Sequence, residues 1–100
     1  MDRWDFVGPL WLWEGNASWH FVTVPEDVSD AIEFRTSDVR AGFGSVRVEV
    51  TVGVTTWRTS VFPDSKRGAY VLPVKKEVRR KESLEVGSEF AIQLALVEAP

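Results

Sequence analysis

Residues 44–62 read GSVRVEVTVGVTTWRTSVF, and this stretch decides the fold. Valines at positions 46, 48, 50 and 52 alternate with polar residues, which predicts a strand with one buried and one exposed face. Gly53 and Val54 then supply a two-residue turn, after which residues 55–62 contain the β-branched and aromatic residues of a second strand. The stretch therefore predicts an antiparallel hairpin inside an all-β fold.

Four further segments have the composition and alternation of strands, at residues 5–13, 19–24, 69–72 and 89–97. The first two are expected to pair as a hairpin, although Pro9 lacks the N–H of a sheet ladder and limits its strand to an edge or a bulge. Two short helices are predicted, one opening at Pro25 and one over residues 74–82.

The two halves of the chain follow the same pattern. FVTVP at residues 21–25 precedes a helix and GSVRVEVTV, and YVLP at residues 70–73 precedes a helix and GSEFAIQLAL. The prolines that align these segments, Pro25 and Pro73, lie 48 residues apart. A duplicated strand–helix–strand unit lets a sheet close on itself and removes exposed edges, whereas chance similarity between two such stretches is the alternative. We expect one domain over residues 1–100, in which two pseudo-repeated halves share a core.

Composition excludes several classes of function. The chain of 100 residues contains no cysteine, so it has no disulfide, no thiolate metal site and no cysteine nucleophile. No stretch approaches the roughly 20 apolar residues of a membrane span, and charged residues with Pro9 interrupt the N-terminal segment where a signal peptide needs an apolar run. We therefore expect a cytoplasmic protein without membrane contact.

Charge is unevenly distributed along the chain. The formal net charge is −3, yet residues 66–81 hold seven of the 12 basic residues against one acid, Glu77, which gives this segment +6 and the remainder −9. A basic patch on an acidic body attracts anions locally. The candidate binding residues for a phosphate-bearing ligand or nucleic acid are Lys66, Arg67, Lys75, Lys76, Arg79 and Arg80. A solvated helix face, or pairing with the acidic first helix, is the alternative.

The five tryptophans are numerous for a chain of this length. An aromatic ring beside cations can stack on a base or another planar ligand, so Trp57 with Ser60 and the basic helix form a candidate pocket. Packing in the core is the alternative for these rings.

No group of residues in the sequence predicts catalysis. His20 is the only histidine and has no carboxylate nearby in sequence to orient it, and no nucleophile elbow or phosphate loop is present. A row of acids on the first helix has the spacing to hold a hard cation, but such a row is also typical of a solvated face: Glu26, Asp27, Asp30 and Glu33. We expect no catalytic residue, no metal and no cofactor. A protein-interaction or accessory domain, which needs none of these, is the alternative to anion binding.

Segments throughout the chain resemble a bacterial family catalogued as domain of unknown function nineteen-oh-five. They read WHFVTVP at residues 19–25, GFGSVRVEV at 42–50, WRTSVFP at 57–63 and GAYVLPVKKEVRRKESLEVGSEF at 68–90. The resemblance implies a small double-split β-barrel of two pseudo-repeated halves with two short helices, one over each end. Members of the family are sometimes joined to domains of the YdeI/OmpD-associated kind, and no activity is assigned to the family.

A more distant similarity is to the AbrB-like swapped-hairpin fold. Residues 72–90 follow its outline of a strand ending in proline, a helix with arginines and a glycine turn, at Pro73, Arg79, Leu84 and Gly87. They depart from it at Ser88, where that family usually has an acid. In AbrB-like proteins a dimer builds the DNA-binding surface, whereas this chain contains both halves itself.

Overall fold

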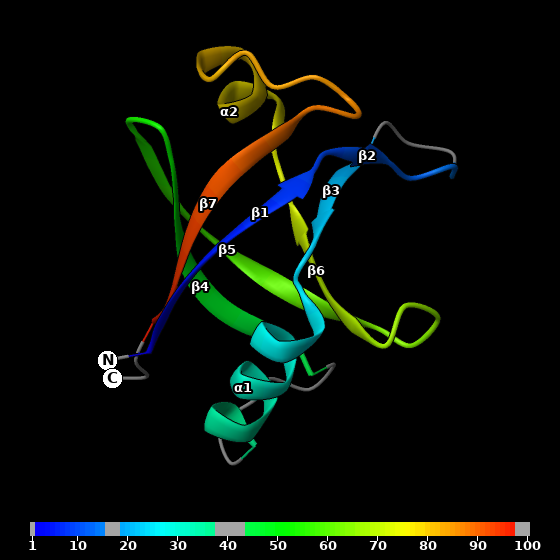
Figure 1. The fold of residues 1–100 in the computed structure, drawn as a ribbon, viewed down its shortest axis with the longest axis vertical. Coiled ribbons are helices and arrows are strands. Elements are labelled where there is room, and N and C mark those ends of the chain that lie inside the picture. Colours follow the sequence, from blue (N-terminus) through cyan, green and yellow to red (C-terminus); the bar gives the residue numbers. More distant parts are fainter. Residues whose placement is uncertain (1, 16–18, 38–43, 98–100) are drawn as a thin grey trace.

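The computed structural model describes residues 2–15, 19–37 and 44–97 and confirms an all-β fold with two helices (Figure 1). Its elements are β1 (Arg3–Pro9), β2 (Trp11–Leu12), β3 (His20–Thr23), α1 (Glu26–Thr36), β4 (Val46–Val52), β5 (Thr55–Asp64), β6 (Ala69–Pro73), α2 (Lys76–Lys81) and β7 (Glu89–Leu96). The strands form one curled antiparallel sheet in the order β1-β7-β4-β5-β6-β3-β2.

The hairpin that the valine alternation predicts is present as β4 and β5. These strands pair from Val46 opposite Val61 to Val52 opposite Thr55. The four alternating valines of β4 are all buried, so the face that the sequence pattern marks as apolar is the face that packs into the core. Gly53 in the turn has φ of 58°, a left-handed conformation that glycine adopts without steric cost.

The two outer strands of the curled sheet are neighbours along the chain. β1 lies at one end of the strand order and β2 at the other, and Leu10 alone separates them along the chain. β1 pairs with β7 up to Pro9, and β2 pairs with β3, so one nearly continuous segment joins both ends of the sheet. β1 is an outer strand of the order, which is the edge alternative predicted for the strand that contains Pro9, because proline has no N–H to extend the ladder.

The structure contains the two pseudo-repeated halves, but their equivalent residues lie 50 rather than 48 positions apart. Pro25 caps α1 and Lys75 caps α2. The residue before each cap donates a 2.9 Å backbone hydrogen bond to the other half, Val24 N–H to Tyr70 O and Val74 N–H to His20 O. Pro25 and Pro73 are therefore not equivalent positions: Pro25 caps a helix, whereas Pro73 ends β6.

The two helices lie at opposite ends of the curled sheet (Figure 1). Helix α1 buries Val28 and Ile32, and the four acids of its predicted polar face are exposed. Helix α2 buries Val78 but begins two residues later than predicted, because Val74 is held in extended conformation by its bond to His20. Within the described ranges, neither helix is long and apolar enough to cross a bilayer.

Candidate functional site

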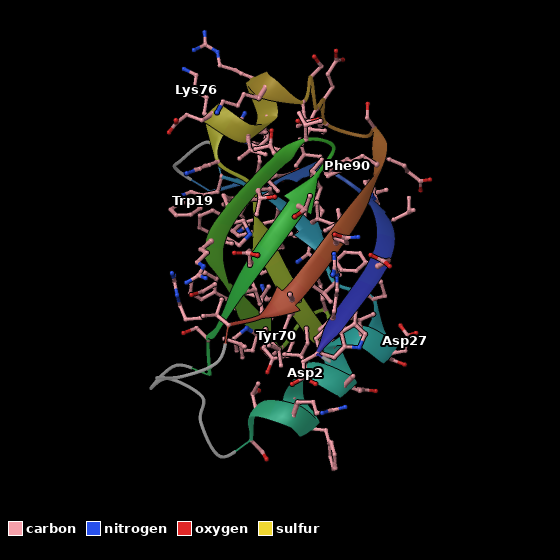
Figure 2. All side chains as sticks on the ribbon, turned by 90° about the vertical axis from the view of Figure 1, so that its left-hand side faces the viewer. Asp2, Trp19, Asp27, Tyr70, Lys76 and Phe90 are labelled. Atoms are coloured by element: carbon pink, nitrogen blue, oxygen red, sulfur yellow. The ribbon has the colours of Figure 1, made fainter. Side chains whose placement is uncertain are left out.

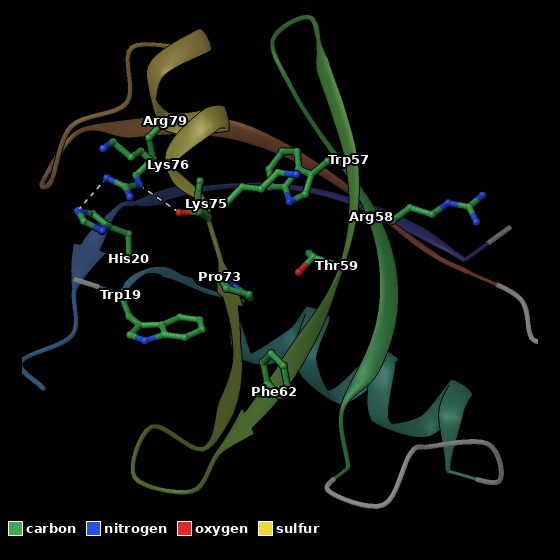
Figure 3. Close-up of a pocket in the computed structure, with 11 residues that line it drawn as sticks. Trp19, His20, Trp57, Arg58, Thr59, Phe62, Pro73, Lys75, Lys76 and Arg79 are labelled. Atoms are coloured by element: carbon green, nitrogen blue, oxygen red, sulfur yellow. Dashed lines mark hydrogen bonds between the residues drawn. The ribbon is translucent and has the colours of Figure 1, made fainter. Parts of the chain in front are cut away.

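A cavity of about 430 Å³ lies between α2, the start of β3 and the middle of β5 (Figure 3). We call it the basic cavity. It is lined by Trp19, His20, Trp57, Arg58, Thr59, Phe62, Pro73, Val74, Lys75, Lys76 and Arg79. Three of the six basic residues that the sequence selects, and one of its two predicted pocket residues, thus meet in one place.

The cationic wall of the basic cavity comes from the start of α2. Lys75 and Lys76 are exposed, whereas Arg79 is half-buried and held in place. Its Nε donates to the backbone oxygen of Val74 at 3.2 Å, and its NH1 lies 3.4 Å from His20 Nε2 (Figure 3). Because a guanidinium has donors only, Arg79 is the donor in any hydrogen bond between these two side chains.

No ion pair among the described residues involves the cations of this wall. The ion pairs in the described part of the chain join Arg35 to Asp2, Arg58 to Glu49 and Arg67 to Asp64. None of the described residues that line the basic cavity is an Asp or Glu. Arg58 points away from the other lining side chains in Figure 3, consistent with its contact to Glu49.

The carboxylate of Glu82, the C-terminal cap residue of α2, contacts the turn between β4 and β5. It accepts a 2.6 Å hydrogen bond from the Thr55 hydroxyl and a 3.3 Å hydrogen bond from the Val54 N–H. These contacts tie α2 to the β4–β5 turn. The acid therefore fixes the position of the helix instead of offsetting the charge of the basic cavity.

The opposite wall of the basic cavity is aromatic. Trp57 is buried, but Trp19 and Phe62 keep 50% and 41% of their surface exposed. The indole of Trp19 stacks on Phe21, with centroids 6.0 Å apart and an interplanar angle of 11°. Phe21, on which this indole stacks, is not among the residues that line the basic cavity.

Thr59, and not Ser60, joins Trp57 in the lining. Arg58 and Phe62 of the same strand also line the basic cavity, whereas Ser60, which the sequence suggested as the partner of Trp57, does not.

The remaining predicted basic residues lie outside the basic cavity. Arg80 is exposed on α2, and Lys66 and Arg67 are in the turn between β5 and β6. Arg67 NH1 lies 3.0 Å from Asp64 Oδ2, and its guanidinium carbon is 3.9 Å from the ring centroid of Trp11. Partial burial raises the pKa of Asp64, but hydrogen bonds from the Arg67 side chain and from the backbone of Arg67 and Lys66 outweigh it and lower that pKa below its usual value.

Sequence reasoning missed Trp19 and Phe62 as lining residues and His20 as a contact of Arg79. All three depend on long-range pairing: β3 lies beside β6 with Phe21 opposite Pro73, which brings the start of β3 to the start of α2. No short stretch of the sequence encodes which residues of β3 and β6 lie opposite each other. The exposed aromatic residue at the start of a short strand is the one feature that could have pointed to Trp19.

The α1 end has an equivalent cavity of about 360 Å³ with the opposite charge. We call it the acidic cavity, because Asp30, Glu33 and Asp64 are among its lining residues. Ser29, which lies 50 positions before Arg79, donates its hydroxyl to Val24 O at 3.1 Å, the counterpart of the Arg79 bond to Val74. Figure 2 shows Lys76 and Trp19 at the α2 end and Asp27 and Tyr70 at the α1 end.

The acids of α1 do not gather into a metal site. Among the residues that the structure describes, no three His, Asp or Glu side chains are close enough together to hold a metal ion. The row that has helical spacing in the sequence is instead an exposed helix face: Glu26, Asp27, Asp30 and Glu33.

Comparison with known proteins places the chain in a family. No curated protein matches the sequence. A family model described as domain of unknown function (DUF1905) matches residues 6–94, a range that includes both helices and every residue of the basic cavity. The match covers most of the chain, as the sequence resemblance implied, and the chain therefore belongs to the DUF1905 family.

Proposed function

We propose that the protein is a non-catalytic binding module whose basic cavity holds a phosphate-bearing ligand or nucleic acid. One observation carries the proposal: Lys75, Lys76 and Arg79 face an aromatic-walled cavity, and no carboxylate is among the described residues that line it. Like charges on one short helix repel one another, so an anion between them lowers their electrostatic energy.

The three cations differ in the way they suit a phosphate. Arg79 is already oriented by its bonds to Val74 and His20, so little side-chain entropy is lost when its remaining donors bind an oxyanion. Lys75 and Lys76 are exposed point charges that can adjust to the ligand. The body of the protein is acidic, which directs anions to this end of the molecule.

The lining favours binding over catalysis. General acid–base and nucleophilic catalysis need a base that is within hydrogen-bond reach of its partner and oriented by a third group. In the described lining, Nε2 of His20 lies 3.4 Å from NH1 of Arg79, so the ring nitrogen nearest the cations already contacts a guanidinium. The side chains that remain are suited to stacking and charge recognition.

The test is a calorimetric titration with inorganic pyrophosphate and with a mononucleotide, at low and at moderate salt. Lys76→Glu should weaken binding about tenfold or more, because it replaces an attraction by a repulsion at the cavity wall. Lys81→Glu is the matched control, since it makes the same charge change on the same helix at an exposed position outside the cavity. No binding by the parent, equal losses in both variants, or affinity that is indifferent to salt would refute the proposal.

A protein partner is the second candidate, and the exposed aromatic side chains beside the basic cavity favour it. Trp13 and Trp19 keep 48% and 50% of their surface exposed, and contiguous exposed apolar side chains often mark interaction sites. Binding of such a partner would survive combined charge reversal of the predicted α2 cations, whereas anion binding would not: Lys75, Lys76, Arg79 and Arg80.

A further inference from the structure

We infer that the ligand is single-stranded nucleic acid, with phosphates at α2 and bases stacked along a groove that extends beyond the basic cavity. This inference rests on the proposed function, because it names the ligand class of the same site. It is drawn from three features of the surface: a second cavity that adjoins the first, aromatic rings that contact one another, and cations at the α2 end.

A second cavity of about 400 Å³ adjoins the basic cavity. Trp19 and Phe62 line both cavities, so the two meet at these side chains, and we call them together the depression. We call the aromatic residues that line the second cavity the aromatic groove: Trp11, Trp13, Trp19, Phe21 and Phe62. A mononucleotide fills one cavity, whereas a strand of several nucleotides reaches across both.

Three of the five rings of the aromatic groove, those of Trp11, Trp19 and Phe21, are held by one another before any ligand arrives. Phe21 lies between Trp19, stacked at 6.0 Å, and Trp11, tilted at a centroid distance of 5.2 Å. The indole nitrogen of Trp11 also donates to the Thr23 hydroxyl at 3.0 Å. The Arg67 guanidinium covers the Trp11 ring, and the exposed rings of the groove are those of Trp13, Trp19 and Phe62. Exposed rings are the platforms on which the bases of a single strand stack, with little dependence on sequence.

The cations of this surface stand at one end of the depression. Lys75, Lys76 and Arg79 lie at the α2 end and form no ion pair with an acid among the described residues. The second cavity is lined by one carboxylate, Asp64, which is paired with Arg67, and the Arg67 guanidinium lies over the Trp11 ring. Cations at one end with rings beyond them match a strand whose phosphates contact α2 while its bases stack on the rings. An apolar protein segment would gain nothing from the cations at α2.

The experiment compares an oligothymidylate and an oligouridylate of about eight nucleotides with a mononucleotide and with pyrophosphate. Fluorescence anisotropy should show the oligonucleotides binding about tenfold or more tightly than the mononucleotide. The slope of log K against log salt should be about −2, the value for three phosphates neutralised on a single strand.

Trp13→Ala distinguishes the contribution of the aromatic groove to binding from that of the basic cavity, because Trp13 lines only the second cavity. It should weaken oligonucleotide binding about fivefold or more and leave pyrophosphate binding unchanged. Phe34→Ala is the matched control, since Phe34 is 82% exposed on α1 at the far end of the molecule. Thermal unfolding of each variant checks that the fold is retained.

Three results would overturn the inference while the proposed function stands. The oligonucleotides bind no more tightly than the mononucleotide, or Trp13→Ala behaves as Phe34→Ala does, or a duplex of equal length binds as well as the single strand. A protein partner that Trp13→Ala releases, in the absence of oligonucleotide binding, would assign the aromatic groove to protein recognition and overturn it too. If pyrophosphate and mononucleotide also fail to bind, the proposed function itself fails.

Discussion

Gly8→Ala tests how the curled sheet closes. Gly8 is buried in β1, where β1 passes over β3. A Cβ at this position would lie 2.8 Å from Val22 Cγ1, well inside the roughly 3.5–4.0 Å at which carbon atoms attract one another. Val22 is fully buried and cannot move away. The backbone of Gly8 does not have a positive φ, so alanine fits its conformation and the substitution isolates the steric contact.

Two opposing effects set the magnitude. Replacing glycine by alanine at a compatible backbone position stabilises a protein by about 0.4–1 kcal/mol, because the unfolded chain loses freedom. Forcing an extra carbon into a packed core costs about 1–3 kcal/mol. We therefore expect Gly8→Ala to lower the free energy of unfolding by about 1–2 kcal/mol. Urea denaturation followed by tryptophan fluorescence measures this value.

Val22→Ala supplies the control, because it removes the carbon that the new methyl group meets. Alone it should cost about 1.5 kcal/mol for the two buried methyl groups. In its presence Gly8→Ala should lose its penalty, so that the double-mutant cycle gives a coupling energy of about 1 kcal/mol or more. If Gly8→Ala raises the free energy of unfolding, or if the effects of the two substitutions simply add in the double mutant, then β1 and β3 do not approach closely at this point.

Three further predictions concern α2 and the β5–β6 turn. Glu82→Ala removes the acceptor of the Thr55 hydroxyl and should lower the free energy of unfolding by about 1–2 kcal/mol in urea. Ser83→Gly should raise it by about 0.5–1 kcal/mol, seen as a higher Tm, because Ser83 has φ of 54°. The pKa of Asp64 is lowered in the fold, so its stabilisation is fully present above the unfolded-state pKa of about 4 and is lost as pH falls through the folded value. Asp64→Asn should therefore flatten the acid side of the stability–pH curve measured by urea denaturation.

The parts of the fold that depend on local pattern could be predicted from the sequence. The alternating valines of β4 and the Gly53 turn specify a hairpin without any knowledge of its surroundings, and both are present. The start of α2 could not be predicted in this way, because the bond from Val74 N–H to His20 O decides it. The same bond sets the repeat spacing, which the prolines in the sequence suggest incorrectly.

The same distinction between local pattern and long-range pairing applies to the candidate site. Lys75, Lys76 and Arg79 are close together in the sequence and remain together in the structure. Arg67 is equally basic in the sequence, but Asp64 three residues before it forms an ion pair with it. Trp19 enters the basic cavity only because β3 pairs with β6, a register that no short segment encodes.

A comparison of the two halves shows which features of the cavities come from the shared backbone arrangement and which come from the side chains. Both helices are docked by a side chain that donates to the backbone oxygen of the residue before the helix cap, Ser29 to Val24 and Arg79 to Val74. The backbone frame is thus the same at both ends, while the acidic cavity would repel a phosphate and the basic cavity would attract it. Since Arg79 both docks α2 and contributes charge, the bond that holds this helix also orients the guanidinium that, in the proposed function, would bind a phosphate. Ser29 performs the same docking without charge, so the frame alone gives no preference for an anion, and the proposed preference would come from the residues of the second half.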